Sequence, residues 1–241
     1  MPALIFQSFL GFNSKTNGKR NKTKSQVKQQ RRWKIIYHDL VSKASIVLTI
    51  VITIYLFTYT NTLLVLFPTF LLSSGLIMEW FLEKRREQDE TTSQKELKNV
   101  GYYALIGVFG LFITGWAVNY IQVPSAIALS NVDALMYGIL MAVSEEVFFR
   151  GFITDGLLTY FGRPSAKIGG FALNNAYVAL GASAGIFAIY HFARYGATPN
   201  ALIYVWVGGF VLSWIAWKSK RLSPSIVAHC ANNIVSLLRV V

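Results

Sequence analysis

Two neighbouring carboxylates and an arginine lie inside a long apolar segment of this chain. Glu145 and Glu146, followed by Arg150, fall within residues 134–160, whose other members are mostly hydrophobic. A helix of that length, rising about 1.5 Å per residue, would cross a hydrocarbon core of roughly 30 Å with both acids near its middle. Ionisable groups at that depth cost on the order of 3 kcal/mol each, so they normally face a partner or a wet cavity. These residues are therefore candidates for chemistry.

Helical spacing separates the two acids by role. Glu146 and Arg150 are four residues apart, so they share a helix face and can form an ion pair. Glu145 lies about 100° around the helix from Glu146 and remains available to titrate or to hold water. The alternative is that the three residues form a buried ion-pair brace with no catalytic task.

Two histidines and an asparagine extend this set on later apolar segments. His191 follows Phe187 by four residues, and His229 precedes Asn233 by four, so each pair shares a helix face. Glu145 and His191 could hold a water molecule and deprotonate it as general base. His229 and Asn233 could stabilise the oxyanion formed when that water attacks a carbonyl group. The chemistry expected from these residue types is hydrolysis of an amide.

The elements that must position these residues are hydrophobic helices. Of the 241 residues, 54% are hydrophobic, and several apolar runs are as long as a spanning helix of about 17 residues or more requires. We predict an all-α, polytopic membrane helical bundle of about seven transmembrane helices. The expected spans are residues 44–60, 62–82, 100–123, 134–160, 168–195, 201–217 and 222–238.

Positive charge is concentrated at the N-terminus. The formal net charge is +12, and residues 1–43 carry ten Lys and Arg against one acid. Under the positive-inside rule this predicts a basic, disordered cytoplasmic tail at residues 1–43, which would contact anionic lipid. Residues 44–133 would hold the first transmembrane helices and a charged cytoplasmic loop, and residues 134–241 the catalytic core. An organelle transit peptide is an alternative for the leader, whereas no nucleic-acid-binding motif is visible.

Two other nucleophiles occur in the apolar half. Ser183 lies in a G-x-S-x-G string at residues 181–185, but a nucleophile elbow needs a strand-to-helix turn. Small residues in an apolar helix more often form a packing surface. Cys230, the only cysteine, adjoins His229, yet adjacent residues on a helix point about 100° apart. Neither residue is favoured as a catalyst.

A metal ion is a further alternative. Glu145, His191 and His229 would supply the three N/O ligands of a catalytic zinc site, with water as the fourth. The H-E-x-x-H spacing of many zinc proteases is absent from the sequence. We therefore expect no cofactor and keep zinc as the less favoured possibility.

Taken together, the three motifs resemble one membrane protease family. E-E-x-x-x-R, F-x-x-x-H and H-x-x-x-N occur in this order within residues 134–238, as in the CAAX protease and bacteriocin-processing (Abi) family, which includes the type II CAAX prenyl endopeptidases. The resemblance implies an intramembrane glutamate-type protease. It assigns water activation to Glu145 and His191, the oxyanion site to His229 and Asn233, and support of that site to Glu146 and Arg150.

The resemblance also implies partners and a location. The substrate would be a peptide or a lipidated protein, in contact with membrane lipids and without nucleic acid. The expected location is a bacterial plasma membrane, with the N-terminus in the cytoplasm. The alternative function is a non-catalytic membrane scaffold or a bacteriocin-immunity protein that uses the same polar network structurally. Glu145→Gln separates the two, because a scaffold tolerates it and a hydrolase does not.

Overall fold

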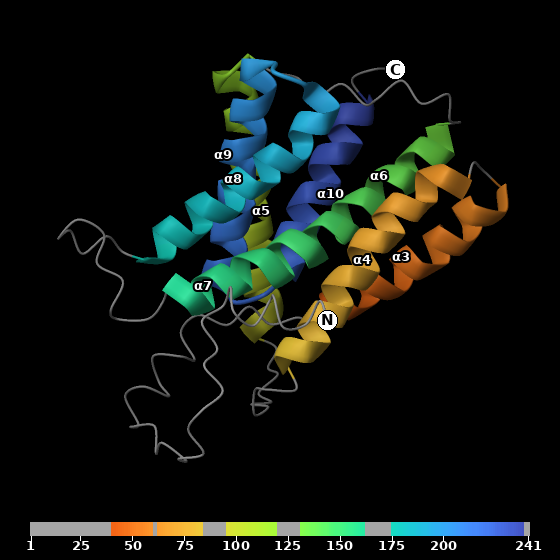
Figure 1. Cartoon of the computed structure of the whole chain (residues 1–241), viewed down its shortest axis with the longest axis horizontal. Helices are drawn as coiled ribbons and strands as arrows, with labels where there is room; N and C mark the ends of the chain where they lie inside the picture. The colour runs from red at the N-terminus through yellow and green to blue at the C-terminus, as the bar shows by residue number, and fades with distance from the viewer. Residues whose placement is uncertain (1–39, 60–61, 84–94, 120–130, 162–174, 239–241) are drawn as a thin grey trace, which may run out of the picture. The chain divides into compact units, whose positions relative to one another are not determined.

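Nearly all of the described backbone is helical. The computed structural model describes residues 40–59, 62–83, 95–119, 131–161 and 175–238, which all belong to one compact unit, Trp33–Val241. The predictions for the basic tail fall almost entirely outside the described residues, and the domain boundaries predicted at residues 43 and 133 stay predictions. The helices (Figure 1) are α3 (Leu40–Tyr59), α4 (Thr62–Glu83), α5 (Lys95–Ala117), α6 (Asn131–Glu145), the π-helix η1 (Glu146–Thr154), α7 (Asp155–Phe161), α8 (Asn175–Tyr195), α9 (Pro199–Ser219) and α10 (Ser223–Leu238).

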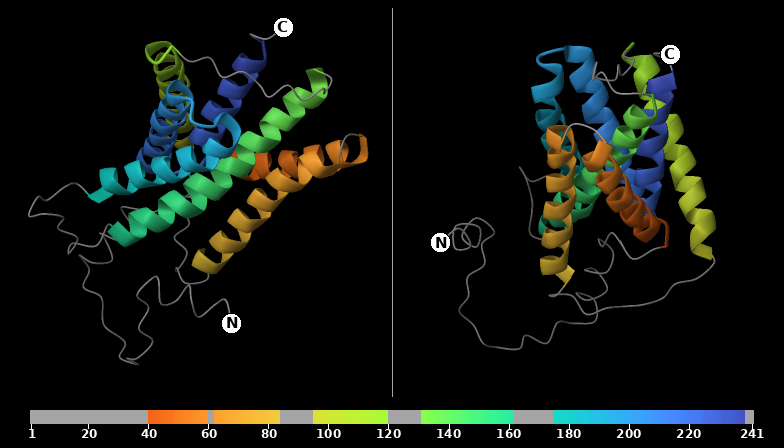
Figure 2. Two further views of the ribbon diagram at one scale, coloured as in Figure 1. Left: turned by 45° about the horizontal axis from the view of Figure 1, so that its top comes forward. Right: turned by 90° about the vertical axis from the view of Figure 1, so that its right-hand side faces the viewer.

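One long rod forms the middle of this unit. α6, η1 and α7 follow one another without a break, so the described helices amount to seven rods, and the predicted all-helical bundle of about seven helices is confirmed. The rod packs against α3 and α4 and also against α8 and α10. Figures 1 and 2 show it as the green diagonal between the orange helices and the blue ones. Groups on the rod can therefore meet α8 and α10.

The outer helices have the length and apolarity of membrane spans. Four such spans occur among the described residues, namely Val41–Tyr59, Asn99–Ala117, Ala176–Tyr195 and Pro199–Ser219, with a shorter apolar helix at Val65–Met78. Large apolar side chains on them point outward, including Trp116, which is 80% exposed, and Ile189, which is 75% exposed. Exposed apolar surface of this kind is stable against lipid. The chain is an integral membrane protein.

A tight connection joins α8 to α9. Gly196 has a φ of +57°, which is readily reached only without a Cβ atom, and its N–H donates to the carbonyl of Phe192 at 2.8 Å. Pro199 then stands at the first turn of α9, where a missing N–H is harmless. The two helices return alongside each other as an extensively packed pair. This hairpin holds His191 near its closed end.

A glycine allows α5 to approach α9 and α10 closely. A Cβ atom built on Gly107 would lie 2.6 Å from Cδ1 of Ile215 and 2.7 Å from Cβ of Ala228. The Ala228 methyl has no rotatable bond by which it could move aside, so the helices themselves would have to separate. The close contact thus depends on the absence of a side chain at this position.

Gly107→Ala is expected to destabilise the bundle by about 1–3 kcal/mol, the usual range for overpacking a well-filled core. The matched control is Gly101→Ala on the same helix, where nothing lies within 4 Å of the added atom. Thermal unfolding of the full chain in detergent would compare the two variants. Equal melting temperatures for both would contradict the described contact of α5 with α9 and α10.

Candidate active site

The π-helix η1 begins directly after Glu145 and carries the other charged residues of the site. Its wider turn follows i→i+5 hydrogen bonding, a geometry that recurs at functional sites. The hydroxyl of Thr154 donates to the carbonyl of Phe149, five residues earlier, at 2.9 Å. More residues per turn bring successive side chains closer together around the axis than in an α-helix. Glu145 ends α6 and Glu146 begins η1, and both contact His229 on α10.

Glu146 bridges an arginine and a histidine. Its Oε1 atom lies 3.0 Å from Nη1 of Arg150 and 2.7 Å from Nδ1 of His229. Glu146 and Arg150 are 0% and 1% exposed, so the carboxylate is stabilised by these partners instead of by water. Because a carboxylate only accepts hydrogen bonds, Nδ1 of His229 carries a proton. The predicted Glu146–Arg150 pairing is present, and His229 joins it.

Glu145 lies at the centre of a second set of contacts. It is 4% exposed; its Oε2 lies 3.6 Å from Nε2 of His229 and its Oε1 lies 3.9 Å from Nε2 of His191. Both separations exceed a direct hydrogen bond, and a water molecule between the groups could bond to both sides. Glu145 thus has two imidazoles beside it, each slightly beyond the reach of a direct hydrogen bond.

His191 is oriented by the backbone of its own helix. Its Nδ1 atom lies 3.0 Å from the carbonyl oxygen of Phe187, and a carbonyl only accepts. Nδ1 therefore carries the proton, so in the neutral ring Nε2 presents its lone pair toward Glu145. The Phe187 ring also stacks under the guanidinium of Arg150 at 4.1 Å, a favourable cation–π contact. The F-x-x-x-H motif is thus connected to the E-E-x-x-x-R motif through the same phenylalanine.

The backbone of α9 closes the site behind Arg150. The arginine Nη2 donates to the carbonyl of Gly209 at 3.4 Å. A Cβ atom on Gly209 would lie 3.0 Å from the Phe187 ring and 3.5 Å from Nη2 of Arg150. A side chain there would crowd both groups, so the glycine lets α9 come near enough to accept one hydrogen bond from the buried guanidinium.

Asn233 hydrogen-bonds to the backbone of the central rod. Its Nδ2 donates to the carbonyl of Gly138 on α6 at 3.0 Å, which fastens α10 to the central rod. Its Oδ1 is buried without a hydrogen-bond partner in the described part of the chain. Of the six residues predicted for the site, five make direct contacts with one another, and Asn233 contacts the backbone beside them.

Ser183 and Cys230 lie in other environments. The Ser183 hydroxyl is 2.6 Å from that of Thr154, and Thr154 is 3.3 Å from the hydroxyl of Ser213. This buried cluster links η1 to α8 and α9. Cys230 packs against an apolar core cluster. The structure therefore gives Ser183 a hydroxyl partner in place of the histidine that a serine protease would need.

One residue of the site was missed by the motif search. The hydroxyl of Tyr190 donates to Oε1 of Glu145 at 3.2 Å. Tyr190 immediately precedes His191 and lies three residues after Phe187, so it falls close to the face of α8 that carries that ring. The sequence held this signal, but a tyrosine in an apolar helix is common enough that spacing alone did not single it out.

Fold and contacts together define a helical membrane protein with a buried site of carboxylates and imidazoles. Residues 127–235 match the family model of type II CAAX prenyl endopeptidase, Rce1-like, proteins. This match confirms the protease family that the three motifs indicated, over the part of the chain that carries them. No curated protein and no solved structure matches the chain.

Metal binding remains a separate question. Across the described helices, no three His, Cys, Asp or Glu side chains are arranged as a metal-ion site. Zinc binding stays a hypothesis.

Arg150→Met is expected to destabilise the protein by about 3–5 kcal/mol, because it leaves the Glu146 carboxylate buried without its cation. Adding Glu146→Gln should recover part of that loss, since the remaining groups are then neutral. The measurement is the melting temperature of the full chain in detergent, with Lys218→Met on the exposed side of α9 as the control. If the changes in melting temperature caused by Arg150→Met and Glu146→Gln simply add in the double variant, this would argue against the Glu146–Arg150 ion pair.

Ser183→Ala is expected to cost about 1 kcal/mol, the net contribution of one hydrogen bond, because Thr154 keeps the Phe149 carbonyl and Ser213 as partners. Any peptidase activity should survive, since Ser183 has no contact with the acids or the histidines. Thermal unfolding and a cleavage assay on the same preparation would measure both effects. A stable but inactive Ser183→Ala protein would revive the serine mechanism.

Proposed function

We propose that this chain is an intramembrane endopeptidase that hydrolyses a peptide bond with water activated by Glu145 and His191. One observation carries the proposal. Nε2 of His191 and Nε2 of His229 face the two oxygens of one buried carboxylate, at 3.9 and 3.6 Å. Both separations are too long for direct hydrogen bonds, and a water molecule beside these atoms could bond to the carboxylate and to an imidazole. Membership of residues 127–235 in a protease family supports the same activity.

The proposed reaction begins with a water molecule between Glu145 and His191. The carboxylate accepts a proton as the water oxygen attacks the carbonyl carbon, and the lone pair on Nε2 of His191 accepts the second water hydrogen bond. The carbonyl π electrons move to oxygen and form a tetrahedral oxyanion. When the C–N bond breaks, the proton held by Glu145 passes to the leaving nitrogen, which yields an amine and a carboxylic acid.

His229 would contribute in its protonated form. Its Nδ1–H is held by Glu146 at 2.7 Å, so a positive charge on the ring would be stabilised by that carboxylate. Nε2–H would then be free to donate to the oxyanion. Arg150 keeps Glu146 ionised and in place. The remaining N–H of the Asn233 amide would add a second donor, as the family resemblance implies.

The proposed substrate is a membrane-associated or small peptide. The name of the matching family refers to prenylated proteins that end in a CAAX sequence, so a lipidated protein is one candidate class. A site inside a helical membrane bundle suits a substrate that is itself anchored in lipid. We further propose that the chain resides in a bacterial plasma membrane, with its basic N-terminal segment in the cytoplasm near anionic lipid.

A scaffold or immunity protein is the second candidate. The burial of Glu146 and Arg150 favours it, because a buried ion pair can also serve only to specify helix packing. That function would need the shape and hydrogen bonds of Glu145 but not its charge. The conservative amide substitution therefore separates the two functions.

Glu145→Gln is expected to remove at least about 10²-fold of the hydrolytic rate, the usual contribution of a general base. Quantitative terminal proteomics on host membranes would compare wild type, Glu145→Gln and Ser183→Ala at matched expression. Protein termini lost in Glu145→Gln and kept in Ser183→Ala would identify the substrate. The scaffold would be favoured if the protein termini are the same in all three strains and the Glu145→Gln strain keeps the phenotype of the wild type.

A further inference from the structure

We propose that Tyr190 is a catalytic residue of this site, whose hydroxyl donates to the oxyanion during hydrolysis. This inference rests on the proposed endopeptidase function. The phenol lies 3.2 Å from Oε1 of Glu145, the carboxylate that would hold the attacking water. A donor at that position is also next to the carbonyl that the water attacks.

Before either ring gains a second proton, the two histidines offer acceptors at this point of the site. His229 has its Nδ1–H committed to Glu146, and His191 has its Nδ1–H committed to the Phe187 carbonyl. Each ring consequently turns a lone pair on Nε2 toward Glu145. Acceptors of this kind hold and deprotonate water, but they do not stabilise a developing negative charge. His229 becomes a donor only after it gains a proton.

Asn233 is a partly engaged donor. Its Nδ2 already donates to the Gly138 carbonyl at 3.0 Å, which directs the amide toward the backbone of α6. The site therefore has one side-chain donor that is neutral, is aimed at the carboxylate and donates whatever the protonation of the histidines. That donor is the Tyr190 hydroxyl.

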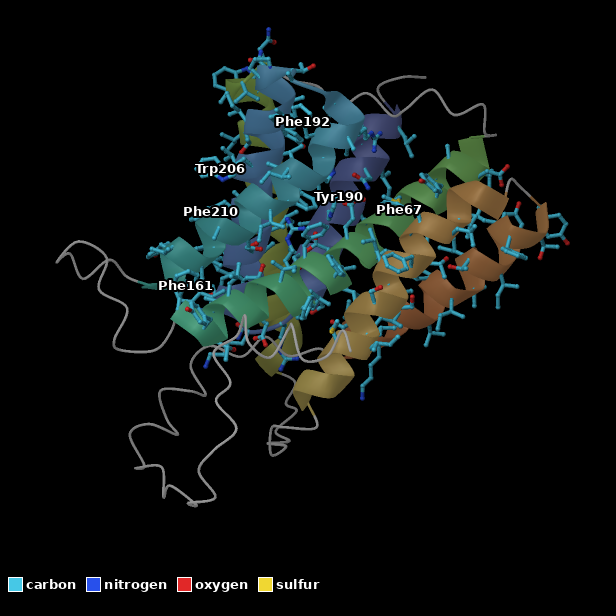
Figure 3. All side chains as sticks on the ribbon, in the orientation of Figure 1. Phe67, Phe161, Tyr190, Phe192, Trp206 and Phe210 are labelled. Atoms are coloured by element: carbon cyan, nitrogen blue, oxygen red, sulfur yellow. The ribbon has the colours of Figure 1, made fainter. Side chains whose placement is uncertain are left out.

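Aromatic neighbours hold the Tyr190 ring in place. It packs against Phe149 of η1 with ring centroids 5.1 Å apart and stacks on Phe67 of α4 at 5.9 Å. Figure 3 labels Tyr190 in the middle of the bundle and Phe67 on α4. Because rings from two other helices pack against it, the Tyr190 ring has little freedom to move. Its hydroxyl group can still rotate about the C–O bond and shift slightly. The donor is thus preorganised, as effective transition-state stabilisation requires.

Proton transfer would release Tyr190 to the oxyanion at the right moment. A hydrogen bond to an ionised acceptor is roughly twice as strong as one to a neutral acceptor. In the resting site the charge is on Glu145, and Tyr190 donates there. Once Glu145 has taken the proton of water, the charge is on the former carbonyl oxygen, so that oxygen becomes the better acceptor. The interaction strengthens only as the transition state forms, which raises kcat.

No further reactant is needed for this step. Tyr190 keeps its proton throughout and only shifts its hydrogen bond from Glu145 to the oxyanion and back. The water supplies the hydroxyl group and the proton that appear in the products. When the C–N bond breaks, the charge leaves the oxyanion, and the deprotonated Glu145 regains the phenol as its partner.

Tyr190→Phe tests the proposal, because it removes the hydroxyl and keeps the ring that packs on Phe67 and Phe149. The full-length protein in detergent would be assayed on the peptide identified by the terminal proteomics and on a farnesylated peptide with a C-terminal CAAX sequence. The expected result is a fall in kcat of about 10²-fold, as for loss of one oxyanion donor, with KM changed by less than about threefold. Tyr177→Phe on the exposed face of the same helix should match wild type.

A phosphinate analogue of the same peptide gives a second readout. The phosphinate copies the tetrahedral, negatively charged intermediate, so its affinity should fall in Tyr190→Phe in parallel with kcat/KM. The control ligand is the same peptide with an N-methylated scissile amide, which is not cleaved and copies the ground state. Its affinity should stay constant. A purely structural Tyr190 would weaken both ligands equally.

The possible outcomes separate the two proposals. If wild type cleaves the peptide, Glu145→Gln does not, and Tyr190→Phe keeps kcat within about threefold, the role of Tyr190 is overturned and the protease stands. If wild type cleaves neither peptide and binds the phosphinate no better than the amide, both proposals fail together.

Discussion

The site depends on one buried carboxylate with two partners. Oε1 of Glu146 contacts Arg150 at 3.0 Å and His229 at 2.7 Å, in a location where an unpaired charge would be strongly destabilising. The arginine keeps the carboxylate ionised, and the carboxylate fixes which nitrogen of His229 carries a proton. That assignment turns the other nitrogen toward Glu145. The pairing that stabilises the buried charge of Glu146 therefore also determines which nitrogen of His229 faces Glu145.

Two adjacent residues at the junction of α6 and the π-helix take part in this arrangement. On a regular α-helix Glu145 and Glu146 would diverge by about 100°, yet both contact the same imidazole ring from its two nitrogens. The wide turn is held by the Thr154 hydroxyl on the Phe149 carbonyl and by the cluster with Ser183 and Ser213. Hydroxyl groups on α8 and α9 thus contact the end of the π-helical segment.

Short-range spacing predicted part of this structure and long-range packing decided the rest. Four-residue spacing anticipated the Glu146–Arg150 contact, and apolar runs anticipated the helical bundle, because both follow from geometry within one helix. Spacing could not indicate that Asn233 would bond to the backbone of α6 or that Tyr190 would reach Glu145. Those contacts depend on how helices rotate and cross. The π-helix was not predicted from the sequence.

The polarity of α10 has a consequence for biogenesis. This helix of 16 residues carries His229, Asn232 and Asn233, and it does not figure among the helices apolar enough to cross a membrane. It packs on α5, α6 and α9, and a helix so polar is stable in lipid only beside such neighbours. Because α10 carries His229, the contacts around Glu145 and Glu146 are complete only after this helix has packed onto its neighbours.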